Sequence, residues 1–421
     1  MKILWLVNQM LPDVAEALGK MPSCKEGWLT GILSSVKKGH DFDLSVAFPV
    51  SINEYQGTID GVNYYGFYED TAHPETYDER LEESLKKIIS SVNPDVIHIF
   101  GTEYPHTLAM CRAASDRPEK LLIGIQGVMD IYKDHYFDGL PKDIINKATF
   151  RDRLKKDSLL EQQRKFALRA ENELKALEIT GNVTGRTDFD RNFTKEKAKN
   201  AKYFFLNESL RPEFYEGTWD INKIRRHSLF LSQGNYPIKG LHVMLKAASL
   251  LREKYPDLHI AVAGDKITRQ ETLKDRIKIS EYGKYLLKLI KDFKLEDVVE
   301  FTGPLSASEV KERLLRNHIF VSASTIENSP NSLGEAMLLG TPSVSSRVGG
   351  VPSIFKEGED GLLFENCNAS ELAECVKKIF ESDALALTFS KNAYEHAHVT
   401  HDRTANYKRL IEIYTEIASK E

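Results

Sequence analysis

Short apolar runs alternate with helical patterns along the whole chain. In the first half, runs without polar alternation are typical of strands buried on both faces. They predict strands at residues 3–7, 44–48, 95–100, 121–125, 177–182 and 203–206. Segment 59–67 alternates and predicts a hairpin or an edge strand. Apolar residues at helical spacing predict helices at 28–38, 81–92 and 105–114, and the charged segment 149–175 is helical in pattern.

The pattern restarts in the second half. Strands are expected at residues 229–232, 258–263, 298–301, 319–322 and 342–345, and helices at 239–253, 332–339, 370–381, 384–396 and 402–419. Strands that alternate with helices predict βαβ units and parallel sheets. A length of 421 residues favours two domains. The aperiodic segment 215–226 is interpreted as the linker, which gives an α/β protein of two Rossmann-like domains, residues 1–215 and 216–401.

Composition narrows the classes of partner and compartment. With 57 Lys and Arg against 62 Asp and Glu, the net charge of −5 gives no basic field for nucleic acid, and no nucleic-acid partner is expected. The four cysteines form no C-x-x-C pair and are interpreted as reduced thiols. The N-terminus lacks a long apolar signal region, and no run approaches the ~20 apolar residues of a membrane span. We therefore expect a cytoplasmic protein.

Two carboxylates flank a loop that precedes a helix in the segment TIENSPNSLGEAMLL, residues 325–339. Parallel sheets bind ligands beyond the carboxyl ends of their strands, and a helix N-terminus attracts anions. Glu327 and Glu335 on either side of such a loop suit the hydroxyl groups on either side of a diphosphate, as in a nucleotide sugar. The alternative is a surface helix capped by Asn331 or Ser332, with solvated glutamates.

A second candidate site lies upstream, in SQGNYPIKGLHVMLKA at residues 232–247. Here a predicted strand ends, a glycine-containing loop follows, and Lys239 enters a helix. An ammonium group beside a diphosphate offsets the negative charge that develops on a leaving group. The alternative is an ordinary lysine at the start of a helix.

These motifs resemble those of retaining family-4 glycosyltransferases of the group 1 type, which include bacterial surface-polysaccharide enzymes. The spacing of Glu327 and Glu335 is similar to the family's E-x7-E motif, and residues 334–364 are close to its usual flanking run. The resemblance implies the GT-B fold, with two parallel sheets facing across a cleft and helix 402–421 packing back on the first domain. It also implies retaining transfer from a UDP- or GDP-sugar to a saccharide or lipid-linked saccharide, with no metal or other cofactor.

The resemblance also implies residue roles. Glu327 would contact the donor sugar and Lys239 the diphosphate as the catalytic residues, while Glu335 would hold the ribose. Further donor-binding residues would be Asn328, Ser329, Pro330, Asn331, Ser332, Gly234 and Gly27. Gly234 departs from the family, which usually has an arginine there. Sugar or acceptor contacts in the first domain would come from Gln126, Glu103, His106 and Arg186. Arg186 could replace the missing phosphate cation, bind an acceptor, or form a structural salt bridge.

Two D-x-D triplets and a basic stretch leave alternatives open. Asp41–Asp43 is interpreted as a turn before a strand and Asp188–Asp190 as the first turn of a helix, so neither is expected to hold a metal. The basic segment 142–169 is either a solvated face or a peripheral contact with the inner face of the cell membrane. Rival functions are an impaired glycosyltransferase-like scaffold subunit, favoured by the glycine at 234, and an epimerase or phosphorylase of the same fold.

Overall fold

The computed structural model describes residues 1–19, 28–39 and 41–420 and divides the chain into two compact units. The first comprises residues 1–133, 165–211 and 401–421, and the second 134–164 and 212–400. The sequence-based boundaries placed residues 134–164 in the first domain, and the structure corrects this. Helix α7 (Phe150–Lys155) packs against α11 (Leu273–Lys278). Asp152 Oδ2 also accepts a hydrogen bond from the Glu281 amide at 2.9 Å.

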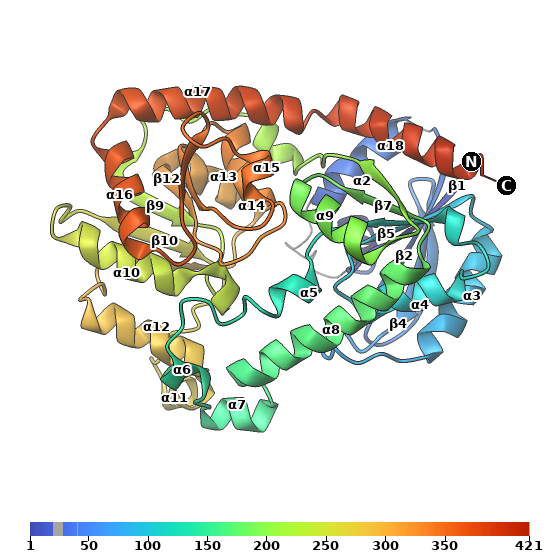
Figure 1. The fold of residues 1–421 in the computed structure, drawn as a ribbon, viewed down its shortest axis with the longest axis horizontal. Coiled ribbons are helices and arrows are strands. Elements are labelled where there is room, and N and C mark those ends of the chain that lie inside the picture. Colours follow the sequence, from blue (N-terminus) through green and yellow to red (C-terminus); the bar gives the residue numbers. More distant parts are fainter. Residues whose placement is uncertain (20–27, 40, 421) are drawn as a thin grey trace. The chain divides into compact units, whose positions relative to one another are not determined.

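The first unit is built on an eight-stranded sheet in the order β3-β4-β2-β1-β5-β6-β7-β8 (Figure 1). All neighbouring strands are parallel except β3 and β4. The strands are β1 Lys2–Leu6, β2 Asp43–Val50, β3 Tyr55–Ile59, β4 Val62–Tyr68, β5 Val96–Phe100, β6 Leu121–Gly124, β7 Asn182–Gly185 and β8 Lys202–Phe205. The β3–β4 hairpin turns at Asp60 and Gly61, both with positive φ, as a tight hairpin turn requires. The hairpin alternative for segment 59–67 is therefore confirmed.

Helices connect these strands. Their bounds are α1 Pro12–Ala17, α2 Trp28–Gly39, α3 Arg80–Val92, α4 Pro105–Ala113, α5 Met129–Tyr132, α8 Leu159–Ile179, α9 Asp188–Lys197 and α18 Arg403–Ala418, with the short 3-10 turn η1 Pro118–Lys120. The strand predicted at 177–182 is wrong. Helix α8 continues to Ile179 with Ala176 and Leu177 buried on it, and β7 begins only after Thr180 and Gly181.

The second unit is built on a six-stranded, wholly parallel sheet in the order β11-β10-β9-β12-β13-β14. Its strands are β9 Arg225–Leu231, β10 His259–Ala263, β11 Val299–Gly303, β12 Asn317–Ser322, β13 Ser343–Ser346 and β14 Gly361–Phe364. Its helices are α6 Lys142–Ile145, α7, α10 Leu241–Arg252, α11, α12 Glu281–Asp292, α13 Ala307–Arg316, α14 Asn331–Leu338, α15 Val351–Ile354, α16 Ala369–Phe380 and α17 Asp383–Thr400, with 3-10 turns η2 Pro212–Tyr215 and η3 Pro237–Lys239.

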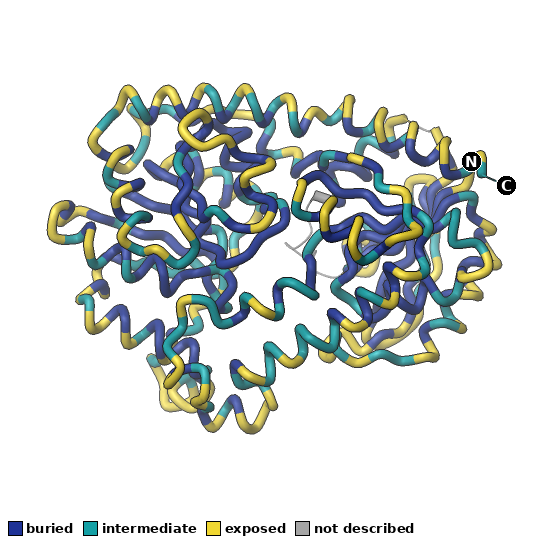
Figure 2. The backbone as a smooth tube through the Cα atoms, in the orientation of Figure 1, coloured by how far each residue is buried: buried dark blue, intermediate teal, exposed yellow. Residues whose placement is uncertain are grey.

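The central strands of both sheets are buried (Figure 2). In the first unit, helix α18 joins the core beside β1 and β5. The Tyr414 hydroxyl accepts a hydrogen bond from Trp5 Nε1 at 2.8 Å and lies 2.6 Å from His98 Nδ1. Burial lowers the pKa of His98 to about 3, so its neutral ring can accept from Tyr414. The predicted α/β fold class of two Rossmann-like domains with parallel sheets is confirmed.

Candidate active site

The loops that carry the two sequence motifs leave the same edge of the second sheet. Strands β9 and β12 are parallel neighbours, so their carboxyl ends lie side by side. Lys239 ends η3, which follows β9, and Glu327 lies in the loop after β12. Lys239 Nζ is 2.5 Å from Glu327 Oε1, which also accepts a hydrogen bond from Ser324 Oγ at 2.8 Å. The structure thus brings together the two residues that the sequence proposes as catalytic.

Glycines allow these loops to approach so closely. Gly240 has φ 66°, and a Cβ on it would lie 1.7 Å from the Ala323 carbonyl oxygen. Gly349 has φ 48°, and its Cβ would lie 2.0 Å from the Glu327 carbonyl oxygen. That same oxygen accepts a hydrogen bond from the Gly350 amide at 3.0 Å. Any side chain at Gly240 or Gly349 would push apart the loops that hold the Lys239–Glu327 pair.

The pair is largely shielded from solvent, with 21% of the Lys239 side chain and 11% of the Glu327 side chain exposed. Burial lowers the pKa of Lys239, but the attraction of the Glu327 carboxylate outweighs it and raises that pKa above its ordinary value. Lys239 is therefore an ammonium ion throughout the physiological range. An anion that approaches the pair would meet an ammonium group held in place by the Glu327 carboxylate.

Glu335 and the intervening loop frame the other side of this edge. Glu335 lies on α14 and is 4% exposed, and Asn328 is fully buried. Pro330, also buried, is the N-cap of α14 and provides no side-chain hydrogen bond to the first turn, so the helix is not capped by Asn331 or Ser332. Ser329, Asn331 and Ser332 are half-buried. The positive end of α14 is thus presented by the loop that Glu327 and Glu335 flank.

Side chains pack closely around Gly234, the position at which the resembled family usually has an arginine. Gly234 is buried, and a Cβ on it would lie 2.8 Å from both Leu241 Cδ2 and Val262 Cγ1. An arginine at this position would require both side chains to move. The neighbouring Asn235 was not predicted as a site residue. Its Oδ1 is buried and accepts no hydrogen bond within the described residues, so it is a further polar group at this loop.

In the first unit, Arg186 forms an ion pair with a residue that no motif indicated. Its Nη1 donates to Glu208 Oε1 at 2.7 Å, and both residues are buried. Gln126 Nε2 donates to the same oxygen at 2.6 Å. These contacts correspond to the structural salt bridge among the alternatives for Arg186. Glu208 follows β8 without a recognisable pattern around it, so only the folded chain identifies it.

His106 and Glu103 lie near the carboxyl ends of β1 and β5 in the same unit. His106 is fully buried, with Nδ1 2.8 Å from Glu69 Oε2 and Nε2 2.9 Å from Asn8 Oδ1. Glu103 Oε1 accepts from the Gly127 amide at 2.7 Å, while its Oε2 is buried with no hydrogen-bond partner in the part of the chain described. Burial raises the pKa of Glu103. Gly27, the remaining predicted site residue, lies outside the described residues.

Glu173 on α8 is a second buried carboxyl group beside Glu103, and no sequence motif indicates it. Its Oε1 pairs with the Thr102 hydroxyl, and its Oε2 accepts from the Asp130 amide at 2.8 Å. Burial raises the pKa of Glu173 to about 8, and the charge of Glu103 acts in the same direction. Glu173 is therefore easier to protonate than an ordinary glutamate, and its Oε1 accepts the hydrogen bond of the Thr102 hydroxyl.

The D-x-D triplets have the local roles that the sequence indicated. Asp188 and Asp190 are in the first turn of α9, where Asp190 forms a capping box with Thr187, and Asp43 begins β2. Across residues 1–19, 28–39 and 41–420, no three His, Cys, Asp or Glu side chains are grouped as a metal site needs. Over the same ranges no helix is both long and apolar enough to cross a membrane.

Comparisons with known proteins agree with this architecture. Sucrose-phosphate synthase from Thermosynechococcus elongatus has the same fold with a TM-score of 0.70 at 15% identity, over 99% of both chains. Anabaena Alr3699/HepE in complex with UDP and glucose aligns with a TM-score of 0.66 at 16% identity, again over 99% of both chains. The chain is therefore a protein of the GT-B fold class.

Residues 218–396, which lie in the second unit, match the model of the family described as glycosyl transferases group 1. D-inositol 3-phosphate glycosyltransferase of Pseudarthrobacter chlorophenolicus is 28% identical over 158 residues, 37% of this chain and 35% of that protein. The putative colanic acid biosynthesis glycosyltransferase WcaL of Escherichia coli is 30% identical over 142 residues, 32% of each chain. The chain thus spans about a third of the length of these curated relatives.

Proposed function

We propose that this protein is a retaining glycosyltransferase that moves a sugar from a UDP- or GDP-sugar to a saccharide or lipid-linked saccharide. The observation that carries the proposal is the Lys239–Glu327 pair at the carboxyl edge of the second sheet. Anabaena Alr3699/HepE is described in complex with UDP and glucose, which makes a UDP-sugar the first donor to test. The similarity to WcaL supports an acceptor of the surface-polysaccharide kind.

In this proposal the donor diphosphate lies at Lys239 and the N-terminus of α14, both of which offer positive charge. Glu335 accepts hydrogen bonds from the ribose hydroxyls, and Glu327 accepts from the donor sugar. As the glycosidic bond breaks, negative charge grows on the departing diphosphate, and the fixed ammonium group stabilises it. The departing phosphate oxygen takes the proton of the attacking acceptor hydroxyl on the same face, so the anomeric configuration is retained.

A binding or scaffolding role remains the second candidate because of one observation. The family that the motifs resemble usually has an arginine where Gly234 stands, and a Cβ at Gly234 would overlap the side chains of Leu241 and Val262. A subunit that binds a nucleotide sugar without turnover would keep Glu335 and lose catalysis. Transfer to an acceptor, measured beside nucleotide binding, separates the two roles.

The proposal predicts that Glu335→Ala weakens binding of the bare nucleoside diphosphate. Losing a hydrogen bond to a charged group costs about 1.5–3 kcal/mol, so affinity should fall roughly ten- to a hundredfold. Titration calorimetry with UDP and GDP measures it. The matched control is Glu374→Ala, an exposed glutamate on α16 of the same unit. Equal nucleotide affinity in a folded Glu335→Ala variant would overturn the ribose assignment.

A further inference from the structure

Two short helices of the second unit expose large apolar side chains. Phe150 and Leu154 are four residues apart on α7, and Leu273 and Ile277 are four apart on α11, so each pair shares a helix face. Their exposed fractions are 69%, 73%, 76% and 59%. The two helices contact each other. Single exposed apolar residues are ordinary, but two such pairs on adjoining helices mark an interaction surface.

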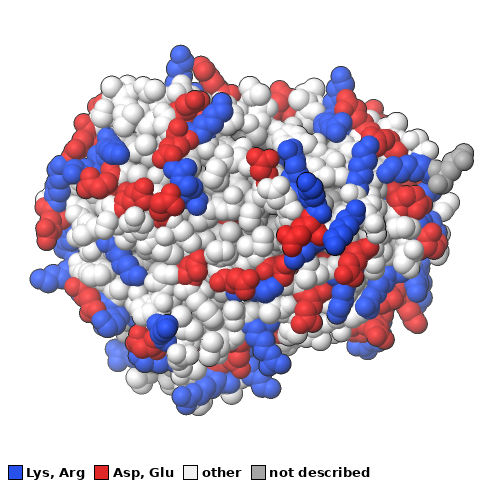
Figure 3. All heavy atoms as spheres, viewed as in Figure 1, with Lys and Arg blue, Asp and Glu red and all other residues white. Residues whose placement is uncertain are grey.

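The same region is basic within an acidic chain. Residues 142–157 and 264–280 contain more positive than negative side chains. The positive ones are Lys142, Lys147, Arg151, Arg153, Lys155, Lys156, Lys266, Arg269, Lys274, Arg276 and Lys278, against Asp143, Asp152, Asp157, Asp265, Glu271 and Asp275. Figure 3 shows Lys and Arg side chains gathered along the lower edge of the view, where α7 and α11 lie in Figure 1. We call these two segments and their side chains the α7–α11 surface.

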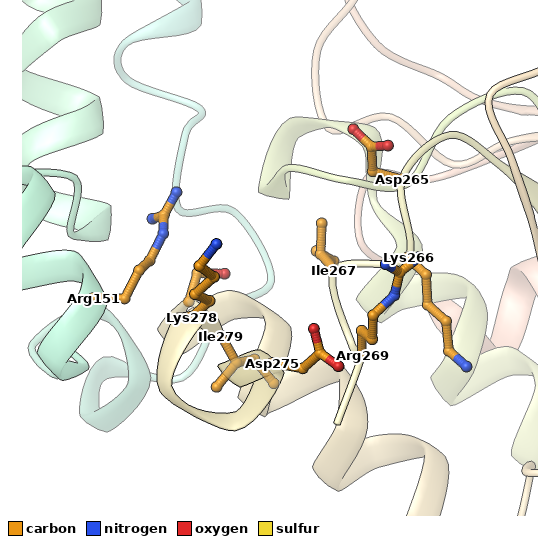
Figure 4. Close-up of a pocket in the computed structure, with 9 residues that line it drawn as sticks. Arg151, Asp265, Lys266, Ile267, Arg269, Asp275, Lys278 and Ile279 are labelled. Atoms are coloured by element: carbon orange, nitrogen blue, oxygen red, sulfur yellow. The ribbon is translucent and has the colours of Figure 1, made fainter. Parts of the chain in front are cut away.

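A pocket of about 550 Å3 opens within this surface (Figure 4). Arg151 of α7 lies on one side of it, Lys278 of α11 lies beside Arg151, and Arg269 and Lys266 come from the loop after β10. Two carboxylates also line the pocket. One of them, Asp275, accepts hydrogen bonds from the backbone amide and the hydroxyl of Thr272.

The cations of the pocket differ in how far they are neutralised. Arg151 pairs with Asp157 at 2.6 Å, and Lys266 pairs with Glu271 at 3.1 Å. Within the described residues, Arg269 and Lys278 have no carboxylate at ion-pair distance. Arg269 and Lys278 are thus the cations of the pocket that remain available to a phosphate group, although the Asp265 and Asp275 carboxylates line the same pocket and Asp275 interacts electrostatically with both cations.

The α7–α11 surface lies near the edge of the sheet that carries the candidate active site. Residues 265–269 directly follow β10, and β10 is the parallel neighbour of β9, which leads to Lys239. An acceptor held in a membrane would therefore meet the donor domain from the edge where the donor loops emerge.

We propose that the α7–α11 surface docks this protein on an anionic phospholipid bilayer. The four apolar side chains enter the interface, the basic side chains contact lipid phosphates, and the pocket holds one headgroup phosphate. Apolar insertion and electrostatic attraction together give stable peripheral binding where either alone is weak. A nucleic acid would leave the apolar pairs unexplained. The proposal uses no residue of the donor site, so it stands or fails separately from the proposed transfer reaction.

Vesicle co-sedimentation of the full chain tests the proposal, with vesicles of phosphatidylcholine alone and of an equal mixture with phosphatidylglycerol. Three variants are compared with wild type: Phe150→Ser with Leu154→Ser, Lys155→Glu with Lys156→Glu, and Arg269→Glu with Lys278→Glu. The matched control is Ile52→Ser with Val399→Ser, apolar residues that are 76% and 77% exposed elsewhere. Melting temperatures establish that every variant is folded.

The expected result is salt-sensitive binding to the mixed vesicles, weakened about tenfold or more in each of the three variants and unchanged in the control. Absence of binding to mixed vesicles overturns the proposal. So does wild-type binding to pure phosphatidylcholine that is as strong as binding to the mixed vesicles. Binding of all three variants to mixed vesicles at the wild-type level overturns it as well. Titration with inorganic phosphate and glycerol phosphate forms the second arm. If these bind as tightly as vesicles do, and the Ser variant binds vesicles like wild type, the pocket is a site for soluble anions and the membrane proposal is wrong.

Discussion

At the scale of single residues, Gly234 has the most informative environment. Its buried Cα faces Leu241 and Val262, so the loop after β9 is packed for a glycine. A side chain at this position would therefore have to displace those two residues. Lys239 is left as the cation that this loop supplies to a diphosphate.

We predict that Gly234→Arg does not install a working phosphate contact. The new Cβ overlaps Leu241 and Val262, and forced overpacking typically costs about 1–3 kcal/mol of stability. Gly234→Ala carries the same Cβ and should lower the melting temperature as well. Thermal unfolding and turnover of both variants, each compared with wild type, test this prediction. An arginine variant that is as stable as wild type and faster would show that the site is open.

Glu173 gives a prediction about pH. Its folded pKa of about 8 lies above the ordinary value of 4.5, so the folded state binds the proton more tightly. Stability from this group is then present at low pH and is lost as pH rises from about 4.5 to about 8. Glu173→Gln resembles the protonated form and removes this loss. Its free energy of unfolding, relative to wild type, should therefore increase with pH over this range, by up to about 1.4 kcal/mol per pH unit.

Denaturant unfolding near pH 5 and near pH 7.5 measures this difference. Glu171→Gln is the matched control, since Glu171 is exposed on the same helix and should give no pH-dependent difference. A constant difference between Glu173→Gln and wild type at both pH values would contradict a protonated Glu173.

Site residues whose role is indicated by neighbouring sequence were predicted, whereas residues whose role depends on contacts with distant parts of the chain were not. The motifs around Glu327 and Lys239 stand out because the glycines and helix starts beside them form recognisable patterns. Glu173 and Glu208 acquire their importance from contacts with Thr102 and Arg186, far away in sequence. A single sequence carries no signal for such pairs, so only the folded structure identifies them.

At the scale of elements, α18 packs apolar side chains into the core of the first unit and adds one buried hydroxyl that hydrogen-bonds residues of the sheet. We predict that Tyr414→Phe lowers the free energy of unfolding by about 1–3 kcal/mol, because Trp5 Nε1 and His98 Nδ1 lose their partner in the core. Tyr407→Phe is the matched control on the same helix. The Tyr407 hydroxyl bonds Asp41 at an exposed position, so its loss should cost little. Equal effects of the two substitutions would contradict this role for Tyr414.

Buried strands were predictable because their apolar runs are short and lie between turn residues. The strand predicted at 177–182 was an error because the end of helix α8, with Ala176 and Leu177, is a short apolar run like that of a buried strand. Helices α12 and α13 and strand β14 were not predicted from the sequence. The two helices have Ser N-caps at Ser280 and Ser306 that could have indicated them.

At the scale of the whole molecule, the two-domain division followed from chain length and the restart of the strand–helix pattern. The association of residues 134–164 with the second unit did not, because it depends on packing of α7 against α11 and on the Asp152–Glu281 contact. The amino-acid composition of such a segment does not indicate which unit it packs against.

We predict that sugar transfer proceeds without a divalent cation, because a lysine and a helix N-terminus are proposed to offset the diphosphate charge. Turnover should be the same with and without EDTA. Loss of turnover in EDTA, with rescue by manganese or magnesium, would assign the protein to the metal-dependent class instead.

The most direct test of the account is turnover of a panel of UDP-, GDP- and ADP-sugars by wild type and by Lys239→Ala, with release of the nucleoside diphosphate as the measured quantity. The account predicts turnover of at least one UDP- or GDP-sugar by wild type. Removing one preorganised charge-stabilising group commonly costs about 10²–10³ in rate, and Lys239→Ala should lose at least that much while remaining folded by circular dichroism. If no donor is turned over, or if folded Lys239→Ala releases nucleotide at the wild-type rate, the candidate active site described for the second unit is wrong.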